Sequence, residues 1–196
     1  MYRHIRIALL SGLIFLLLIP ATNAQRKKEE PPSFKDRIFF GGNFGLTFGN
    51  TTSIIINPVA GYRLTPRLSP GIGLRYEYFK SNYPGYVPYD THIYGGSLFA
   101  RYMLIKNLSE AIGLGGLNSG IFLQGEYEIL SLESQYFDFT NPVPGSRFNL
   151  HSMLVGGGIY QPIGARSGFL FTILWNLNES YNSIYANPII RIGFNF

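Results

Sequence analysis

Cysteine is absent from this chain of 196 residues, which excludes disulfide bonds, thiolate metal sites and the lipid-attachment cysteine of a lipoprotein. The three histidines, His4, His92 and His151, are too scattered in the sequence to predict a metal cluster. There is also no phosphate-binding loop, because the glycines at 41–42, 95–96 and 156–158 fall within extended segments. We therefore expect no cofactor and no metal.

A strong excess of one charge is also missing from the part of the chain that is expected to fold. The pI of 9.4 belongs to the whole chain, including its basic N-terminal region. From residue 36 onward, 10 Lys and Arg residues face 9 Asp and Glu residues. A nearly neutral domain has no basic face for phosphates, so nucleic acid is not an expected partner.

Long apolar runs are scarce as well. The run at residues 7–19 is shorter than the ~20 residues of a transmembrane helix. It follows Arg3 and Arg6 and precedes small residues at 21–24, a pattern that predicts a signal peptide, residues 1–24, cleaved after Ala24. A retained N-terminal anchor is the alternative. Residues 25–35 are polar and contain Pro31 and Pro32, which predicts a periplasmic tether before a single domain at 36–196.

Period-two alternation is the dominant pattern of that domain. In the last segment, Ile190, Ile192, Phe194 and Phe196 fall on one face of an extended strand, and Arg191 falls on the other. Eight such segments follow one another: 37–48, 53–64, 68–80, 91–104, 121–130, 149–162, 168–178 and 187–196. Each is about as long as a tilted strand that crosses a bilayer. The mean hydropathy of +0.09 suits a wall in which only alternate residues are apolar.

The pattern predicts an all-β fold: a closed, antiparallel, eight-stranded transmembrane β-barrel with up-and-down meander topology. Short turns at 65–67 and 163–166 and long loops at 81–90 and 131–147 agree with an outer-membrane barrel, whose two rims differ in this way. The connection at 105–120 is too long for a tight turn, so we expect an insertion that forms a short helix or a flap. A soluble lipocalin-like barrel is the rival fold, but it would carry apolar residues inside and charges outside.

These features resemble the small outer-membrane β-barrels of Gram-negative bacteria, the OmpA/OmpX-like group. The matching segments are 39–45 (FFGGNFG), 71–78 (GIGLRYEY), 123–128 (LQGEYE) and 192–196 (IGFNF). The resemblance implies a location in the cell outer membrane, with outer-membrane lipid around the wall. It also implies that Phe194 and Phe196 form the C-terminal signal read by the barrel-assembly machinery. It does not specify an activity, because the group includes structural, adhesive, secretion-related and enzymatic members.

Six charged residues are expected to point into the bore. Unpaired charges there would cost several kcal/mol each, so we expect them to pair across strands in a structural network. A narrow ion path lined by the same groups is the alternative. We expect Arg75 and Arg101 to contact Glu126 or Glu128. The full set is Arg75, Glu77, Arg101, Glu126, Glu128 and Arg191.

Aromatic residues form two further groups of candidates. Rings on the outward face near strand ends favour the bilayer interface, which predicts a membrane girdle of Tyr62, Tyr76, Tyr78, Tyr94, Tyr102, Tyr127, Tyr160 and Trp175. Rings in the long loops either bind a ligand or partner or pack together to close the barrel mouth. These loop candidates are Tyr83, Tyr86, Tyr89, Tyr136, Phe137 and Phe139.

We expect a non-enzymatic envelope or surface protein that acts through its outer loops on an envelope protein or surface ligand. His151 and Ser152 are the one pair comparable to the catalytic residues of lipid A-modifying barrels, but neighbours on a regular strand point to opposite faces. A narrow transport pore, a component of a protein-secretion complex and a lipid A-modifying enzyme are the alternatives.

Overall fold

A computed structural model describes residues 33–113, 118–164 and 166–196. The expected signal peptide and most of the expected tether lie outside the described residues. Residues 34 and 35, expected at the end of the tether, instead form one helical turn with the next two residues, α2 (Phe34–Arg37). The Phe34 ring packs against Tyr62 with 5.3 Å between ring centroids, so this turn lies on the wall of the domain.

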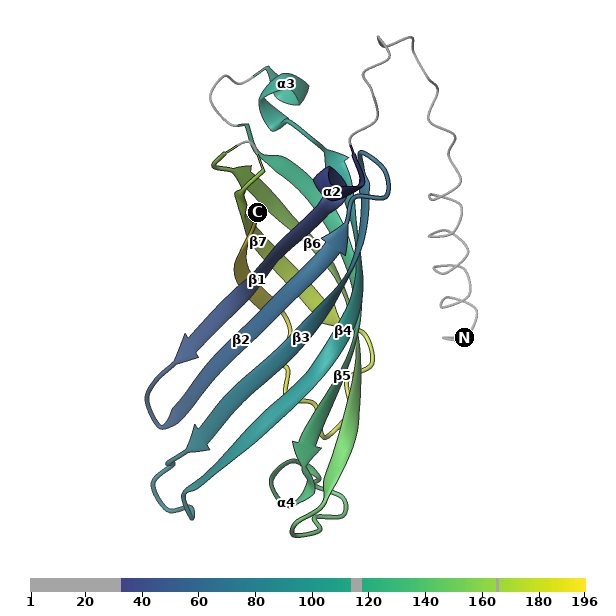
Figure 1. The fold of residues 1–196 in the computed structure, drawn as a ribbon. Coiled ribbons are helices and arrows are strands. Elements are labelled where there is room, and N and C mark those ends of the chain that lie inside the picture. The colour runs from purple at the N-terminus through teal and green to yellow at the C-terminus, as the bar shows by residue number, and fades with distance from the viewer. Residues whose placement is uncertain (1–32, 114–117, 165) are drawn as a thin grey trace, which may run out of the picture. The chain divides into compact units, whose positions relative to one another are not determined.

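Eight strands follow one another and close into a barrel in sequence order, with β8 returning to β1 (Figure 1). All neighbouring pairs are antiparallel. The strands are β1 (Ile38–Thr47), β2 (Thr51–Tyr62), β3 (Leu68–Ser81), β4 (Tyr89–Ile105), β5 (Gly120–Glu133), β6 (Arg147–Pro162), β7 (Gly168–Asn176) and β8 (Ile189–Asn195). The predicted fold class, a closed eight-stranded antiparallel barrel with meander topology, is confirmed.

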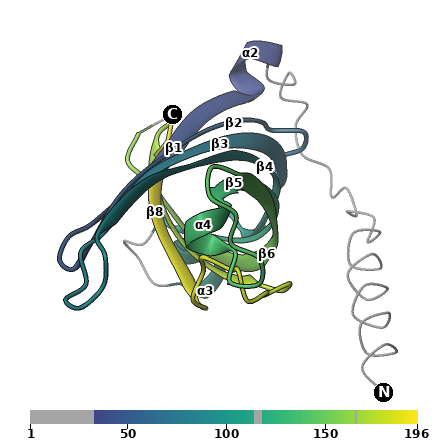
Figure 2. The same ribbon diagram turned by 90° about the horizontal axis from the view of Figure 1, so that it is seen from below.

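The two rims of the barrel differ in character (Figures 1 and 2). We call the rim that carries α2, α3 and the C-terminal residue the terminal end. The opposite rim, the loop end, carries α4 (Ser134–Phe137) and the connections at 48–50, 82–88, 138–146 and 177–188. Among the described residues, no helix is long and apolar enough to cross a membrane.

The insertion expected at 105–120 contains a short helix, α3 (Leu108–Ile112). The Asn107 side chain accepts a hydrogen bond from the Ser109 amide at 3.0 Å, which satisfies a free donor of the first turn. Gly113 ends the helix with a φ of 70°, a left-handed conformation that glycine adopts without a steric penalty.

Strand alternation sorts the side chains between the bore and the outer wall. In β5, Gln124, Glu126 and Glu128 are buried, whereas Leu123 and Tyr127, on the opposite face of the strand, are exposed. The outer wall is consequently apolar: Leu74, Leu98 and Ile192 are 65%, 63% and 63% exposed. Exposed apolar area on this scale is unusual for a soluble monomer.

An apolar cluster fills the bore near the loop end. Ile93, Leu130, Leu132, Phe137 and Leu150 are buried together there. Phe137 belongs to α4, so the connection between β5 and β6 folds back and contributes to this cluster. Figure 2 shows α4 lying across the mouth when the barrel is seen from the loop end. Polar side chains lie deeper, between this cluster and the terminal end.

Candidate functional site

The structure places all six predicted lumen charges inside the barrel and brings five of them together. Arg75 donates to Glu77 at 2.6 Å, and Arg191 donates to both oxygens of Glu126 at 3.0 and 2.9 Å. Glu128 lies between the two arginines, 3.8 Å from each. The Glu128 side chain has no exposed area, so this shared contact compensates a carboxylate that water does not reach.

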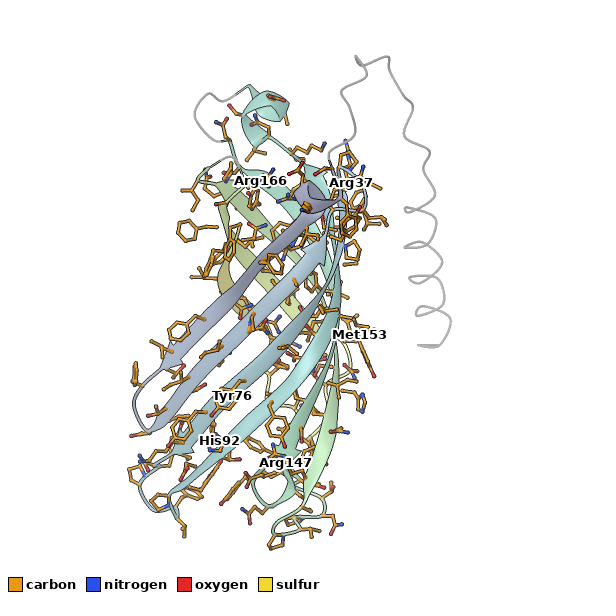
Figure 3. The ribbon with its side chains drawn as sticks, viewed as in Figure 1. Arg37, Tyr76, His92, Arg147, Met153 and Arg166 are labelled. Carbon is orange, nitrogen blue, oxygen red and sulfur yellow. The ribbon has the colours of Figure 1, made fainter. Side chains whose placement is uncertain are left out.

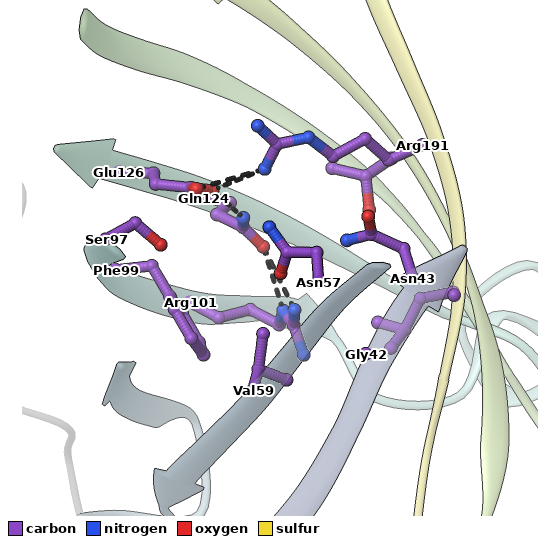
Figure 4. Close-up of a pocket in the computed structure, with 13 residues that line it drawn as sticks. Gly42, Asn43, Asn57, Val59, Ser97, Phe99, Arg101, Gln124, Glu126 and Arg191 are labelled. Atoms are coloured by element: carbon purple, nitrogen blue, oxygen red, sulfur yellow. Dashed lines mark hydrogen bonds and ion pairs between the residues drawn. The ribbon is translucent and has the colours of Figure 1, made fainter. Parts of the chain in front are cut away.

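Arg101 departs from the expected pairing. Its guanidinium donates to the Gln124 side-chain oxygen at 3.2 and 3.0 Å, and Gln124 donates to Glu126 at 2.9 Å (Figure 4). The predicted contact of Arg101 with a carboxylate is therefore replaced by a contact through an amide. The Arg101 guanidinium also lies over the rings of Phe99 and Phe122, 5.5 and 4.9 Å from their centroids. The aromatic faces compensate part of its charge.

Tyr185, which the sequence analysis did not select, completes the network from the loop between β7 and β8. Arg75 donates to its hydroxyl at 2.7 Å, and the hydroxyl donates to Glu128. Burial raises the pKa of the Tyr185 hydroxyl, which keeps it protonated and able to donate. The available signal was weak: Ile184 and Tyr185 are two large side chains at the end of a mostly polar loop.

Cavities on the two sides of the network differ greatly in size. On the side of the terminal end, Arg101 lines two spaces of about 40 and 90 Å³. Figure 4 shows the residues around the first of them. On the side of the loop end, a cavity of about 640 Å³ is lined by Arg75, Tyr185 and Arg191. The charged pairs thus occupy the bore between these spaces, and Ile93 and Phe137 of the apolar cluster line the large cavity. This arrangement supports a structural role for the charges more than an open ion path.

The loop aromatics divide into a buried group and an exposed group. Tyr89 stacks on Tyr136 with centroids 4.3 Å apart, and Phe137 is buried in the apolar cluster. Tyr83, Tyr86 and Phe139 remain exposed, at 51%, 79% and 72%. The two readings of these loops therefore apply to different residues, and only the exposed rings are free to meet a partner.

A hydrogen-bonded turn joins two of the loops. The Asp138 carboxylate accepts from the Thr140 hydroxyl at 2.6 Å and from the Asn182 amide at 3.3 Å. The hydrogen bond from Thr140, followed by the one from the Asn141 amide, lowers the pKa of Asp138. The carboxylate therefore remains ionised in ordinary buffers and links the loop after α4 to the loop that carries Tyr185.

The predicted girdle residues point outward, with one exception. Tyr160 faces the bore, where it lines a cavity with Arg101 and Phe39. Its ring fills the space above Gly168, whose Cβ would lie 2.3 Å from Tyr160 Cε2. The expectation for Tyr160 was wrong because the glycines at 156–158 obscure the alternation in β6. The outward residues are Tyr62, Tyr76, Tyr78, Tyr94, Tyr102, Tyr127 and Trp175.

Both histidines of the described domain lie on the outer wall. The Tyr76 hydroxyl lies 2.8 Å from His92 Nδ1, and the Tyr127 hydroxyl lies 2.8 Å from His151 Nδ1 (Figure 3 shows the first pair). His151 is exposed while Ser152 is fully buried, so the two point to opposite faces as expected. Among the described residues, no three metal-binding side chains cluster.

The C-terminal residues lie against the first strand. Phe196 exchanges two backbone hydrogen bonds with Phe40, at 3.0 and 2.9 Å. The rings of Phe194 and Phe196 stack outward with centroids 6.0 Å apart. They are accessible on the outer wall, but their role as an assembly signal stays a prediction.

Comparisons with known proteins do not identify a family for this chain. No family model matches the chain, and no curated protein matches it. Among solved structures, it is similar to the N-terminal β-barrel domain of Pseudomonas aeruginosa OprF, with 12% sequence identity and a TM-score of 0.43. That match covers 82% of this chain and 94% of the OprF domain.

Proposed function

We propose that this protein is a non-enzymatic integral protein of the cell outer membrane that acts at the surface through its outer loops. One observation carries the proposal: the strands turn large apolar side chains outward and paired charges inward. A soluble barrel has the opposite arrangement. A hydrocarbon environment favours outward-facing apolar side chains such as Leu74 and Leu98, while charged side chains such as Glu126 stay inside the barrel.

The loop end supports the surface role. Tyr83, Tyr86 and Phe139 are exposed there, on loops that the packed Tyr89, Tyr136 and Phe137 hold against the barrel. Exposed aromatic side chains on loops that are already packed in place can bind a partner with little further loss of conformational entropy. An envelope protein or a surface ligand is the proposed class of partner.

Membrane insertion is tested by fractionation and gel mobility. The folded protein should sediment with outer membranes and run at a different gel position before boiling than after it. A protein found in the soluble periplasmic fraction would overturn the proposal.

Orientation is tested with single cysteines, since the native chain has none. Tyr86→Cys at the loop end should react with a membrane-impermeant maleimide on intact cells, and Arg67→Cys at the terminal end should react only after lysis. The reverse pattern would place the loops in the periplasm and remove the surface role. Co-purification after crosslinking through Tyr86→Cys then identifies the partner.

The filled bore argues against the pore alternative. Arg75, Tyr185 and Glu128 are hydrogen-bonded across it, and the apolar cluster lies beside them. We expect no steady single-channel conductance from the wild-type protein in a planar bilayer. Reproducible conductance steps would restore the transport reading.

A further inference from the structure

The closure of the barrel between β1 and β8 is incomplete toward the loop end. In the described strands, the ladder joins residues 41–43 to residues 193–195, and it ends there. Both strands continue beyond it, because β1 extends to Thr47 and β8 begins at Ile189. Figure 2 shows the loop ends of β1 and β2 projecting away from β8. We call the unpaired stretch, residues 44–47 and 189–192, the seam.

The large cavity reaches the seam and passes through the wall. Phe44, Ile190 and Ile192 point outward and are 57%, 59% and 63% exposed, yet all three line the cavity. Ile93 and Phe137, which are buried in the bore, line the same cavity. One space bordered by residues of both faces therefore connects the bore with the outer wall. The outward residues beside this opening are apolar, so in a membrane the opening faces hydrocarbon.

The lining is suited to a molecule with an apolar chain. The volume of about 640 Å³ lies within the ~300–1,000 Å³ range of small-molecule sites. The unpaired strand edges supply backbone donors and acceptors, which membranes tolerate only where they line a cavity or are covered. The apolar side chains of the lining include Ile55, Phe79, Ile93, Phe137 and Ile184.

The charged side chains beside the cavity are already paired with one another, so they favour neither an anionic nor a cationic occupant. Arg75 lies 2.6 Å from Glu77, and Arg191 lies 2.9 Å from Glu126. Glu128 lies 3.8 Å from both arginines. The three charged side chains of the lining, Arg75, Glu77 and Arg191, are only 7%, 8% and 11% exposed. A charged head group would leave water without gaining a free counter-ion.

An uncharged polar group lies at the deep end of the cavity. Asn43 lines both the large cavity and the smaller space that Arg101 lines, so it lies where the two meet (Figure 4). It is also the last residue of β1 that pairs with β8 below the seam. Among the residues that the structure describes, its side chain has no hydrogen-bond partner. A carboxamide both donates and accepts, so it suits a hydroxyl or a carbonyl group.

We infer that the cavity binds an uncharged single-chain amphiphile, a hydrocarbon chain with one hydroxyl or carbonyl head, which enters from the membrane through the seam. The chain lies against the apolar lining, and the head forms a hydrogen bond with Asn43. The inference rests on the proposed membrane location. A charged amphiphile, a phospholipid and a second copy of this protein are different occupants that the test separates.

Three substitutions separate the parts of this site. A Cβ at residue 45 would lie 3.4 Å from the Ile55 side chain, so Gly45→Trp places a ring in the cavity. Gly125 faces outward with nothing within 4 Å of an added Cβ, so Gly125→Trp is the matched control on the outer wall. Asn43→Leu keeps a side chain of similar size and removes the amide. Unchanged gel mobility and membrane fractionation establish that each variant folds and inserts, independently of binding.

Binding is measured by photolabelling of the purified protein in phosphatidylcholine nanodiscs. The probe is hexadecan-1-ol with a diazirine in the middle of its chain, and the mapped adducts distinguish the cavity from the outer wall. The wild type and Gly125→Trp should show saturable labelling in the cavity, and Gly45→Trp should bind at least about tenfold more weakly because the ring overfills the space. Asn43→Leu should weaken competition by hexadecan-1-ol about two- to tenfold, the effect of one hydrogen bond, and leave competition by hexadecane unchanged. An equal effect on both competitors, or on neither, removes Asn43 as the partner of the head.

Charged competitors test the head group on the wild type alone. Hexadecyl sulfate and hexadecyltrimethylammonium should each compete at least about tenfold more weakly than hexadecan-1-ol, because neither charge finds a free counter-ion. Competition by either ion that matches the alcohol overturns the uncharged head. Equal labelling of both tryptophan variants, or a folded, inserted wild type without saturable labelling, overturns the inference. So does a wild type that purifies with phospholipid in the cavity or as a dimer joined at the seam.

The route of entry has its own test. Ile55→Cys lies in the cavity, and Leu98→Cys lies on the outer wall as a control for the membrane phase. In vesicles, a lipid-soluble maleimide should label both variants, and a water-soluble impermeant maleimide should label neither. Labelling of Ile55→Cys by the water-soluble reagent would show entry from the loop end. That result, or labelling of Leu98→Cys alone by the lipid-soluble reagent, overturns entry through the seam.

Discussion

The two halves of this barrel are built from the same strands but are filled and closed in different ways. Toward the terminal end, β1 and β8 are paired, and the remaining spaces are about 40 and 90 Å³. Toward the loop end, the same strands separate, and a cavity of about 640 Å³ lies between the charges and the aromatic loops. The terminal half thus has a continuously paired wall and a nearly filled bore. The loop half has a gap in the pairing of β1 with β8 and a large cavity.

The difference teaches that a closed barrel need not be uniform along its axis. The ion pairs of the bore are fixed by strand register, because each partner projects from a β-strand. In the loop half, Tyr185 and Phe137 come from connections, so their packing depends on how two loops fold back. The terminal half should therefore carry most of the stability, and the loop half should tolerate change.

The largest effect is expected from Glu126→Gln in β5, where residue 126 is paired with both neighbouring strands. It leaves Arg191 buried without its bidentate partner, which should cost about 3–5 kcal/mol in the free energy of unfolding. Glu133→Gln is the matched control, because the ion pair of Glu133 with Arg147 is partly exposed near the loop end. This substitution should lower the free energy of unfolding by only about 0–1 kcal/mol. Urea unfolding in lipid vesicles measures both. Similar losses would remove the energetic distinction between the halves.

A smaller effect is expected from Tyr185→Phe in the loop half. The variant loses the hydrogen bonds to Arg75 and Glu128 and should cost about 1.5–3 kcal/mol, because both partners are charged. Tyr181→Phe is the control in the same loop, where the side chain is 92% exposed, and should change little. The same unfolding assay applies. A neutral Tyr185→Phe would mean that the loop does not hold the network.

The smallest effect compares tightness of packing at two glycines. In the paired half, a Cβ at residue 158 would lie 2.0 Å from the Phe171 carbonyl oxygen, so Gly158→Ala should cost about 1–3 kcal/mol. Toward the loop end, a Cβ at residue 45 would lie 3.4 Å from the Ile55 side chain, which is an ordinary contact. Gly45→Ala should therefore change the free energy of unfolding by less than about 1 kcal/mol. Unfolding midpoints in one vesicle composition decide the order. Equal losses of stability would show that the wall is packed as tightly at Gly45 as at Gly158.

The fold could be predicted because alternate residues of each strand face two different surroundings, the lipid and the bore, and therefore alternate in polarity. In β5, Glu126 and Glu128 alternate with Leu123, Tyr127 and Ile129, and each lies on the expected face. The alternation failed where glycines replaced large side chains, which is why Tyr160 was placed on the wrong face. Arg101 shows the next limit, because strand register brought it beside Gln124 instead of a carboxylate.

The sequence by itself determined the number of strands, the faces of most side chains and the collection of six charges in one bore, since these follow from period-two alternation along single strands. Tertiary structure alone decided that Tyr185 joins those charges and that the loop aromatics divide into packed and exposed rings. It also decided that β1 and β8 are not paired beyond Asn43 toward the loop end. The physical reason is range. Alternation is a property of neighbouring residues, whereas barrel closure and loop packing bring together residues more than a hundred positions apart, such as Arg75 and Tyr185.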